Sequence, residues 1–180
     1  AIGLYNAGAA VFVLATRWRA GIKAASLLII VMGAFASGAR TGAIFTTTKD
    51  GSKVDANIYE DCRDVYLNGG PKGGGPALPE GDYYFMVTSP SGGPPSTLLS
   101  SDALAMRKVH VGASGEFSLY TGSHDQGVDV DDGSVTVQLW PFMKTPNPGN
   151  EYKAWLTPVD RYSADDGTFG FIHRWSKTDN

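Results

Sequence analysis

The sequence predicts an all-β domain, an antiparallel β-sandwich, over residues 40–180. In this part of the chain, short runs alternate apolar and polar side chains, which is typical of strands that bury one face. Clusters of Gly and Pro such as Gly69–Pro76 and Pro146–Gly149 separate these runs and favour turns. No stretch after residue 40 has the apolar spacing of an amphipathic helix of useful length. A closed barrel requires the same alternation and stays open as an alternative.

The clearest predicted strand is Tyr83–Thr88, which is rich in aromatic and β-branched residues and would bury Tyr83, Phe85 and Val87 on one face. The other predicted strands follow the same alternation and are Ile44–Thr48, Val54–Tyr59, Asp64–Leu67, Met106–Val111, Glu116–Tyr120, Val135–Trp140, Tyr152–Leu156 and Phe169–Trp175. The interior is expected to contain the inward-facing apolar side chains of the middle strands, namely Val109, Val111, Phe117, Leu119, Val135, Val137 and Leu139.

An N-terminal hydrophobic helix is predicted to precede the sandwich and to act as a signal peptide. Basic residues within 17–23 lead into the uncharged apolar run 24–36, and small residues follow. This order is typical of a secretory signal, so we expect cleavage after Ala36 or Ala39 and a secreted or cell-surface protein. An uncleaved membrane helix and a hairpin of two membrane segments stay open as alternatives, although the run is short for a permanent span.

Two domains follow from these patterns. Residues 1–39 form the signal peptide or membrane segment, with an upstream extension because the first methionine is Met32. Residues 40–180 form the β-sandwich domain, which is long enough to bury a core. Only residues 176–180 follow the last predicted strand, so we expect a domain truncated at its C-terminus, within a fragment of a longer exported protein.

Charge and cysteine content limit the partners of the exported part. Removing Arg17, Arg19 and Lys23 from the 15 basic residues leaves 12 against 18 acidic ones, a formal net charge of −6. Nucleic acid and anionic membrane surfaces are therefore excluded as partners, and a membrane is contacted only through an uncleaved N-terminal segment. Cys62 is the single cysteine, so no internal disulfide can form, and we expect its side chain to be buried.

Acidic residues cluster at 125–132. The pattern Asp129-x-Asp131-x-Gly133 is similar to the start of a calcium loop, in which carboxylates and a glycine turn surround the ion. The closing Glu of an EF-hand is missing, because Trp140 occupies that position. We expect a solvated acidic turn, and the sequence leaves calcium binding open.

Catalytic, cofactor and metal motifs are not found. The three histidines lack the spacing of a zinc site, and Gly112–Gly115 lacks the glycine pattern of a nucleophile elbow. Gly69–Gly75 has no phosphate-loop ending and is interpreted as an exposed linker. We therefore predict a protein that is not an enzyme and has no cofactor.

Three tryptophans are candidate ligand-binding residues. Trp140, Trp155 and Trp175 lie on or at the ends of predicted strands, and the alternation around Trp155 can turn its ring outward. Exposed aromatic rings stack on sugar rings, whereas buried ones cap the core. These residues support carbohydrate binding as an alternative function.

One local pattern resembles a known family. Leu78-Pro79-Glu80-Gly81-Asp82-Tyr83 is similar to the Leu-Pro-x-Gly-x-Tyr start of a core strand in prealbumin-like repeat modules, the collagen-adhesin B-type and SdrD B-like domains of bacterial surface proteins. A second turn followed by an aromatic strand start occurs at Pro148–Trp155. The resemblance covers about a quarter of the exported part. It implies an Ig-like or prealbumin-like sandwich in a secreted or surface protein.

Together these observations predict a non-catalytic extracellular or cell-surface module with a structural or interaction role, such as adhesion or spacing, within a larger bacterial protein. Its expected partners are other extracellular proteins or polysaccharide. The alternative function is a carbohydrate-binding accessory domain that uses exposed Trp and Tyr residues.

Overall fold

The computed structural model describes residues 42–56, 58–72, 75–90, 96–147 and 149–180. All of them belong to one compact unit. The predicted signal peptide or membrane segment, residues 1–39, lies outside the described residues. Within the described ranges, no helix combines the length and apolarity needed to cross a membrane.

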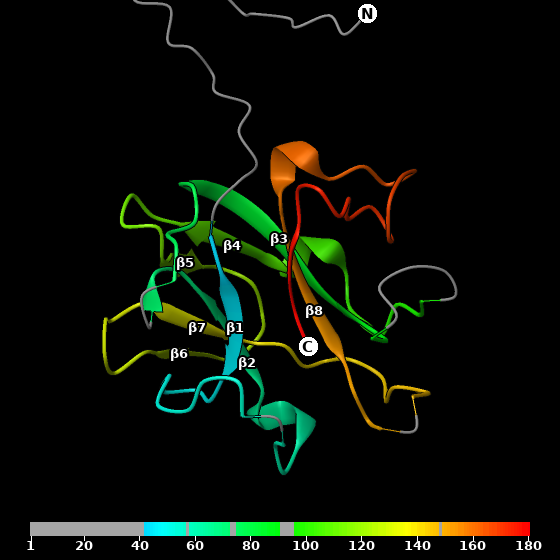
Figure 1. The fold of residues 1–180 in the computed structure, drawn as a ribbon, viewed down its shortest axis with the longest axis horizontal. Coiled ribbons are helices and arrows are strands. Elements are labelled where there is room, and N and C mark those ends of the chain that lie inside the picture. Colours follow the sequence, from blue (N-terminus) through cyan, green and yellow to red (C-terminus); the bar gives the residue numbers. More distant parts are fainter. Residues whose placement is uncertain (1–41, 57, 73–74, 91–95, 148) are drawn as a thin grey trace, which may run out of the picture. The chain divides into compact units, whose positions relative to one another are not determined.

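The part of the chain that the structure describes contains nine strands in two antiparallel sheets (Figure 1). The four-stranded sheet has the order β1 (Ile44–Thr47), β2 (Tyr66–Gly69), β7 (Val135–Gln138) and β6 (Gln126–Val128). The five-stranded sheet has the order β5 (Phe117–Tyr120), β4 (Lys108–Val111), β3 (Gly81–Thr88), β8 (Lys153–Pro158) and β9 (Lys177–Asp179). The described residues also include the short 3₁₀ helices η1 (Cys62–Asp64), η3 (Leu104–Met106) and η4 (Val159–Arg161). The predicted all-β class is confirmed.

The inner faces of both sheets share one hydrophobic core. Tyr83, Phe85 and Val87 of β3 are buried in it, as predicted, together with Leu67 of β2 and Val137 of β7. Of the other predicted interior residues, the buried ones are Val109, Val111, Phe117 and Leu139, and Val135 packs against the core partly buried. Side chains from two sheets in one cluster are consistent with a sandwich.

The prediction that Leu119 lies in the interior is wrong, because its side chain is 54% exposed. The cause is a register shift in the pairing of β4 with β5. Val111 pairs with Phe117, whereas the preceding residue, His110, pairs with Leu119, so Ser118 is skipped. A bulge of this kind inserts one residue and reverses the alternation of all that follow. Leu119 therefore lies on the outer face, and Tyr120 is buried instead.

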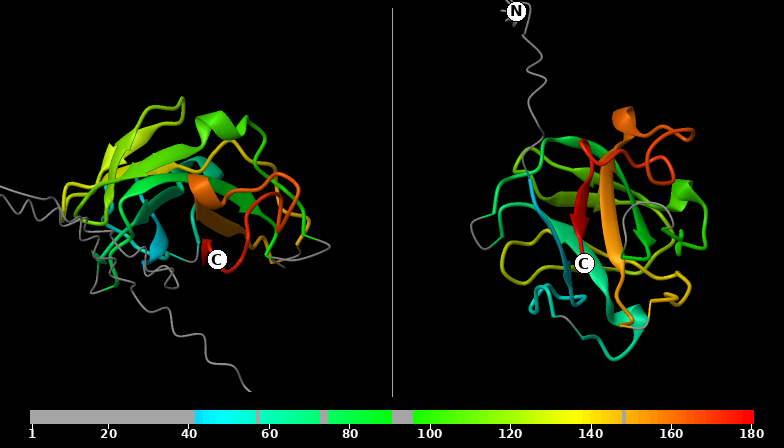
Figure 2. Two further views of the ribbon diagram at one scale, coloured as in Figure 1. Left: turned by 90° about the horizontal axis from the view of Figure 1, so that it is seen from above. Right: turned by 45° about the vertical axis from the view of Figure 1, so that its right-hand side comes forward.

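Part of the outer face of the five-stranded sheet, over β3 and β8, is also covered. A second cluster contains Met86 of β3, Trp155 of β8 and Phe171, with Tyr84 and Tyr162 partly buried beside it. Phe171 and Tyr162 belong to the segment between β8 and β9, which lies next to β8 in Figures 1 and 2. The strands β3 and β8 thus bury side chains on both faces.

Most predicted strands are confirmed with bounds that shift by one or two residues, but two of them are wrong. Neither Val54–Tyr59 nor Phe169–Trp175 forms a strand among the residues described. Asp55 has φ 48°, and Phe169 and Gly170 have φ 51° and 89°. These left-handed conformations turn the chain and are incompatible with an extended strand. The last strand, β9, begins later.

The strand β6 is not predicted from the sequence, since Gly127 at its centre has a low strand propensity. A Cβ atom on Gly127 would collide with the main-chain oxygen of Lys49. The same oxygen accepts a hydrogen bond from Thr136 Oγ1 at 2.6 Å. The turn after β1 therefore packs directly on β6 and β7, and this close approach requires glycine.

The two sheets meet where β1 lies next to β9 (Figure 1). The Thr46 main-chain N–H donates a hydrogen bond to Asp179 Oδ2 at 2.7 Å. No main-chain ladder joins β1 and β9 within the described ranges. The Asp179 carboxylate, and not main-chain strand pairing, thus joins β1 to β9. Two separate sheets are expected to meet in this way, whereas a closed barrel would have a continuous ladder.

Asp179→Asn is expected to raise the free energy of unfolding at pH 7 by about 0.5–2 kcal/mol, the usual size of a stabilising substitution. Burial, with a contribution from the charge of Asp55, raises the pKa of Asp179 above 3.8. The folded protein therefore binds this proton more tightly than the unfolded chain, and stability is lost as the pH rises through the raised pKa. Urea unfolding at pH 7 and pH 3 tests this. The gain should vanish at pH 3, and an equal gain at both values would contradict it.

Candidate functional site

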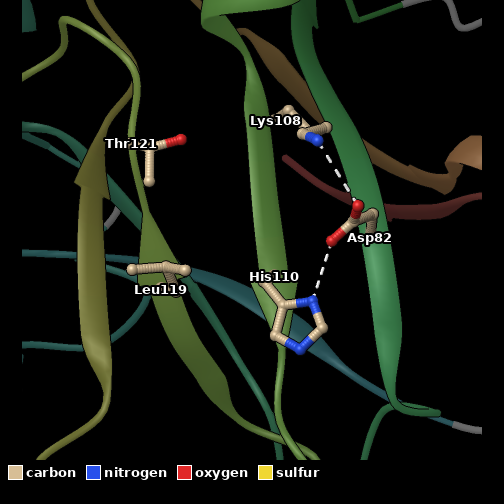
Figure 3. A pocket seen from close by; sticks show the side chains of 5 residues that line it. All are labelled: Asp82, Lys108, His110, Leu119 and Thr121. Carbon is tan, nitrogen blue, oxygen red and sulfur yellow. Dashed lines mark hydrogen bonds and ion pairs between the residues drawn. The ribbon is translucent and has the colours of Figure 1, made fainter.

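A solvent-open hollow of about 300 Å³ lies on the outer face of β3, β4 and β5 (Figure 3). We call this cavity the His110 hollow. It is lined by Asp82, Lys108, His110, Leu119 and Thr121. Asp82 lies directly opposite His110 in the pairing of β3 with β4, which places both side chains on one face. The bulge described above adds the apolar side chain of Leu119.

Asp82 organises the charged groups of the His110 hollow. Its Oδ1 lies 2.8 Å from Nδ1 of His110, and its Oδ2 accepts from Lys108 Nζ at 3.4 Å. The hydrogen bond with His110 is the main reason why the pKa of Asp82 lies below its usual value. No partner contacts His110 Nε2 within the described ranges. With Nδ1–H donating to Asp82, Nε2 accepts a hydrogen bond in the neutral ring and donates one in the protonated ring.

A second hollow of about 510 Å³ shares Asp82 and His110 with the first. It extends to Glu80 directly before β3, and over β8 and η4 through Pro158 and Asp160. The combined surface offers acceptors, donors and apolar groups to a polar ligand. Thr121 lies across the first hollow from His110 in Figure 3, and no hydrogen bond between them is recorded for the described residues. The arrangement thus suits hydrogen bonding to a bound partner.

The structure separates the three candidate tryptophans. Trp155 is fully buried at 0% exposure, so its ring is not accessible to a ligand. Its side chain does point away from the core between the sheets, but the segment between β8 and β9 covers it. Trp140 is 43% exposed, and Trp175 is partly buried beneath two arginines. The ring contacts recorded in the described part join none of the three to another.

Trp155→Phe is expected to lower the free energy of unfolding by about 1–3 kcal/mol, because it removes a buried hydrogen bond. The indole Nε1–H donates to Thr88 Oγ1 at 2.9 Å, and both residues are inaccessible to solvent. Retention on polysaccharide columns should not change. Trp140→Phe is the matched control, with a smaller loss of stability in urea unfolding. Weaker retention of the folded Trp155→Phe variant would contradict the structural role of this ring.

In the acidic cluster, Asp125, Asp131 and Asp132 are exposed as predicted, but Asp129 departs from the solvated turn that the sequence predicts. The Asp129 side chain is 0% exposed and accepts two hydrogen bonds from Lys72 Nζ, at 2.6 and 2.8 Å. Lys72 also reaches Asp131 Oδ2 at 3.1 Å and donates to Gly51 O at 2.7 Å. Asn68 Nδ2 donates to Asp129 Oδ2 at 3.2 Å. These five residues are called the Lys72 network.

A lysine ammonium therefore neutralises the carboxylates that resemble a calcium loop. A Cβ atom on Gly51, which has φ 71°, would collide with the Asp129 carboxylate, so the approach of these loops requires glycine. In the described ranges, no three His, Cys, Asp or Glu side chains are grouped to hold a metal ion. The interpretation of the glycine-rich stretch as an exposed linker is wrong at Lys72, whose side chain is only 14% exposed.

A second buried ionic cluster, called the Arg107 network, consists of Arg107, Asp102 and His124. Arg107 Nε donates to Asp102 Oδ1 at 2.6 Å, and its Nη2 donates to Pro141 O at 2.6 Å. His124 Nε2 lies 2.8 Å from Asp102 Oδ2, and Nδ1 lies 2.7 Å from Gln138 O. Both ring nitrogens thus lie within hydrogen-bond distance of an oxygen atom.

Neither network is predicted from the sequence. Lys72 is a single basic residue among glycines, and Arg107 lies within the predicted strand Met106–Val111, where an exposed charge is the usual case. Partners of this kind are brought together by the path of the loops.

Cys62 is exposed at the start of η1, so the expected burial of its side chain is wrong. Partial burial of the thiol and its hydrogen bond with Asp61 raise the pKa of Cys62 above its usual value. The thiolate, which is the reactive form, is therefore disfavoured at neutral pH.

No known protein family, curated protein or solved structure matches this chain. The resemblance of Leu78–Tyr83 to prealbumin-like modules therefore stays a prediction, and the function is argued from the geometry above.

Proposed function

We propose that residues 40–180 are a non-catalytic interaction module, with an adhesive or spacer role, in an exported bacterial protein. The observation that carries this proposal is the anchoring of several loops to the sheets by two buried ionic networks. A surface that recognises a partner gains from loops that are ordered before binding, because less entropy is lost on association. The partners would be extracellular proteins or polysaccharide.

The Lys72 network holds three connections together. Gly51 lies in the turn after β1, Lys72 follows β2, and Asp129 and Asp131 lie between β6 and β7. The Arg107 network joins the β3–β4 connection to the β5–β6 connection and to the chain after β7. The loops are thereby fixed to the sheets through groups that water does not screen.

A prealbumin-like form of the sandwich is supported by the start of β3. Gly81 has φ 143°, which glycine adopts readily, and Tyr83 begins the buried part of the strand. The Tyr83 hydroxyl donates to Pro79 O at 2.7 Å, which fixes the turn that precedes the strand. These features give a physical role to the Leu-Pro-x-Gly-x-Tyr pattern.

The proposal is tested by locating and probing the protein. The full chain and a version lacking residues 1–39 are expressed in a bacterium, and both are followed by cell fractionation. Export of the full chain alone is expected, and retention of the full chain in the cytosol contradicts the proposed location.

Purified protein is then screened on immobilised extracellular proteins and polysaccharides. A bound partner should lose at least tenfold in affinity with His110→Ala, while the thermal midpoint stays unchanged, and an unaltered affinity contradicts a role of the His110 hollow.

A carbohydrate-binding accessory domain is the second candidate. The specific observation in its favour is Trp140, whose ring is 43% exposed. Retention on neutral polysaccharide columns should decrease with Trp140→Ala if this ring stacks on sugars. Unchanged retention removes Trp140 as a sugar-binding residue.

A further inference from the structure

Two guanidinium groups lie against the ring of Trp175, in the segment that covers the five-stranded sheet. Arg161 Cζ is 4.7 Å and Arg174 Cζ is 4.8 Å from the centroid of the Trp175 ring. Both distances are within the range of cation–π attraction, which orients an arginine side chain before a ligand arrives. Both arginines are exposed, whereas Trp175 is partly buried. Three residues from two turns thus form a preorganised surface group, the Arg-Trp-Arg site.

The hydrogen-bond donors of this site are available to a ligand. The contact of Arg161 Nε with Asp160 Oδ2 measures 3.6 Å, which is too long for a hydrogen bond. Arg174 has no hydrogen bond or ion pair with any residue in the described ranges. A guanidinium carries five N–H donors in a planar fork that matches two oxygens of one carboxylate. Each fork can therefore receive one carboxylate group in a bidentate manner.

The charge of the protein limits the ligand further. The exported part has a formal net charge of −6, which repels long polyanions at a distance. A short anionic oligosaccharide is bound through local contact, because its carboxylates form direct hydrogen bonds with the two guanidinium groups. A neutral sugar would have to displace an arginine from the Trp175 ring before it could stack there. A sugar that carries its own carboxylate binds the arginines where they are.

We propose that the Arg-Trp-Arg site binds uronic acid residues of an acidic polysaccharide. Arg174 and Arg161 each donate hydrogen bonds to a carboxylate of the polysaccharide, beside the partly buried ring of Trp175. The inference rests on the proposed function only in the source of the ligand, an extracellular polysaccharide. It names a chemical class that the sequence alone does not specify.

The test uses the full folded chain and oligogalacturonate as the probe, with oligogalactose of the same length as the neutral counterpart. NMR titration follows the Trp175 indole N–H and the Arg161 and Arg174 Nε–H signals. These signals should shift with oligogalacturonate and not with oligogalactose. Arg174→Gln should reduce the affinity at least tenfold, and Arg174→Lys should also reduce it, since an ammonium cannot form the bidentate contact.

Arg63→Gln is the matched control, because Arg63 is an exposed arginine on η1 that pairs with Asp61 at 2.7 Å. Its affinity should stay within twofold of the unmodified protein. Equal shifts with oligogalactose, tighter binding of oligoglutamate, or an unchanged affinity in Arg174→Gln would each overturn the proposal. Failure of the titration leaves the export test untouched, and failure of export with a successful titration refutes only the proposed location.

Discussion

Lys72→Met is expected to lower the free energy of unfolding by about 3–5 kcal/mol, because it leaves a buried carboxylate without its counter-charge. The Asp129 side chain is 0% exposed, and Lys72 is the only cation that contacts it in the described part of the chain. Asn68 and the Asp131 main-chain N–H would remain as donors but carry no charge. Urea unfolding at pH 7 measures the loss, which is a large share of the stability of a domain of this size.

Lys49→Met is the matched control for this prediction. Lys49 pairs with Asp125 at 2.8 Å, but the two side chains are 56% and 48% exposed. Water screens such a pair, so the loss should stay below about 1 kcal/mol. Equal losses in the two variants would show that burial does not distinguish these ion pairs, which contradicts the structure of the Lys72 network.

The Lys72 network also predicts a pH dependence at high pH. Burial alone would lower the pKa of Lys72, but hydrogen bonds with Asp129 and Asp131 outweigh it and raise this pKa above 10.5. A raised pKa means that the lysine contributes its stability below the unfolded value and loses it as the pH rises through the folded value. The stability difference between the unmodified protein and Lys72→Met should therefore decrease above about pH 10.

Asp102→Ala is expected to have an effect of similar size, about 3–5 kcal/mol, since it leaves the buried Arg107 without its counter-charge and His124 Nε2 without its hydrogen-bond partner. The side chains of Arg107 and His124 are each only 1% exposed. Arg107 Nη1 already has no hydrogen-bond partner in the described ranges, so the site has no spare acceptor. Thermal and urea unfolding measure the loss, and unfolding of the variant at 37 °C is consistent with it.

Asp82→Ala is the matched control, because Asp82 also contacts one histidine and one basic residue. Its partners are His110 at 2.8 Å and Lys108 at 3.4 Å, but all three side chains are more than a third exposed. The loss should be below about 1 kcal/mol. A loss with Asp82→Ala as large as that with Asp102→Ala would contradict the prediction.

The lowered pKa of Asp102 also leads us to expect a loss of stability in acid. Burial acts to raise the pKa of Asp102, but the hydrogen bond with His124 and the charge of Arg107 outweigh it and hold that pKa below 3.8. The contribution is thus present above the unfolded pKa and is lost as the pH falls through the folded pKa. Asp102→Asn should show a weaker decline of stability below pH 4 than the unmodified protein does.

The alternation of side chains was sufficient to predict the class of fold and most strands. Tyr83, Phe85 and Val87 are buried together because a strand places every second residue on one face. The same rule fails at Leu119, where a bulge inserts one residue, and at Phe169, where left-handed residues turn the chain. Bulges and turns of this kind depend on packing with neighbouring strands and leave a weak local signal.

The candidate sites were less predictable than the fold. Trp175 was singled out from the sequence, but Arg161 was not, because only the turn between β8 and β9 brings it to the ring. Trp155 faces outward as its alternation indicates, yet a later segment covers it. Asp82 and His110 are 28 residues apart and meet through the register of β3 and β4.

Local patterns in this chain specify extended strands, turns and the sign of the net charge, because each depends on neighbouring residues and on composition. The burial of Lys72, Asp129, Arg107 and Asp102, and the position of two arginines on Trp175, arise from contacts between connections that are separated in the sequence. Their energies depend on distance and on exclusion of water, and neither quantity is a property of a short stretch of sequence.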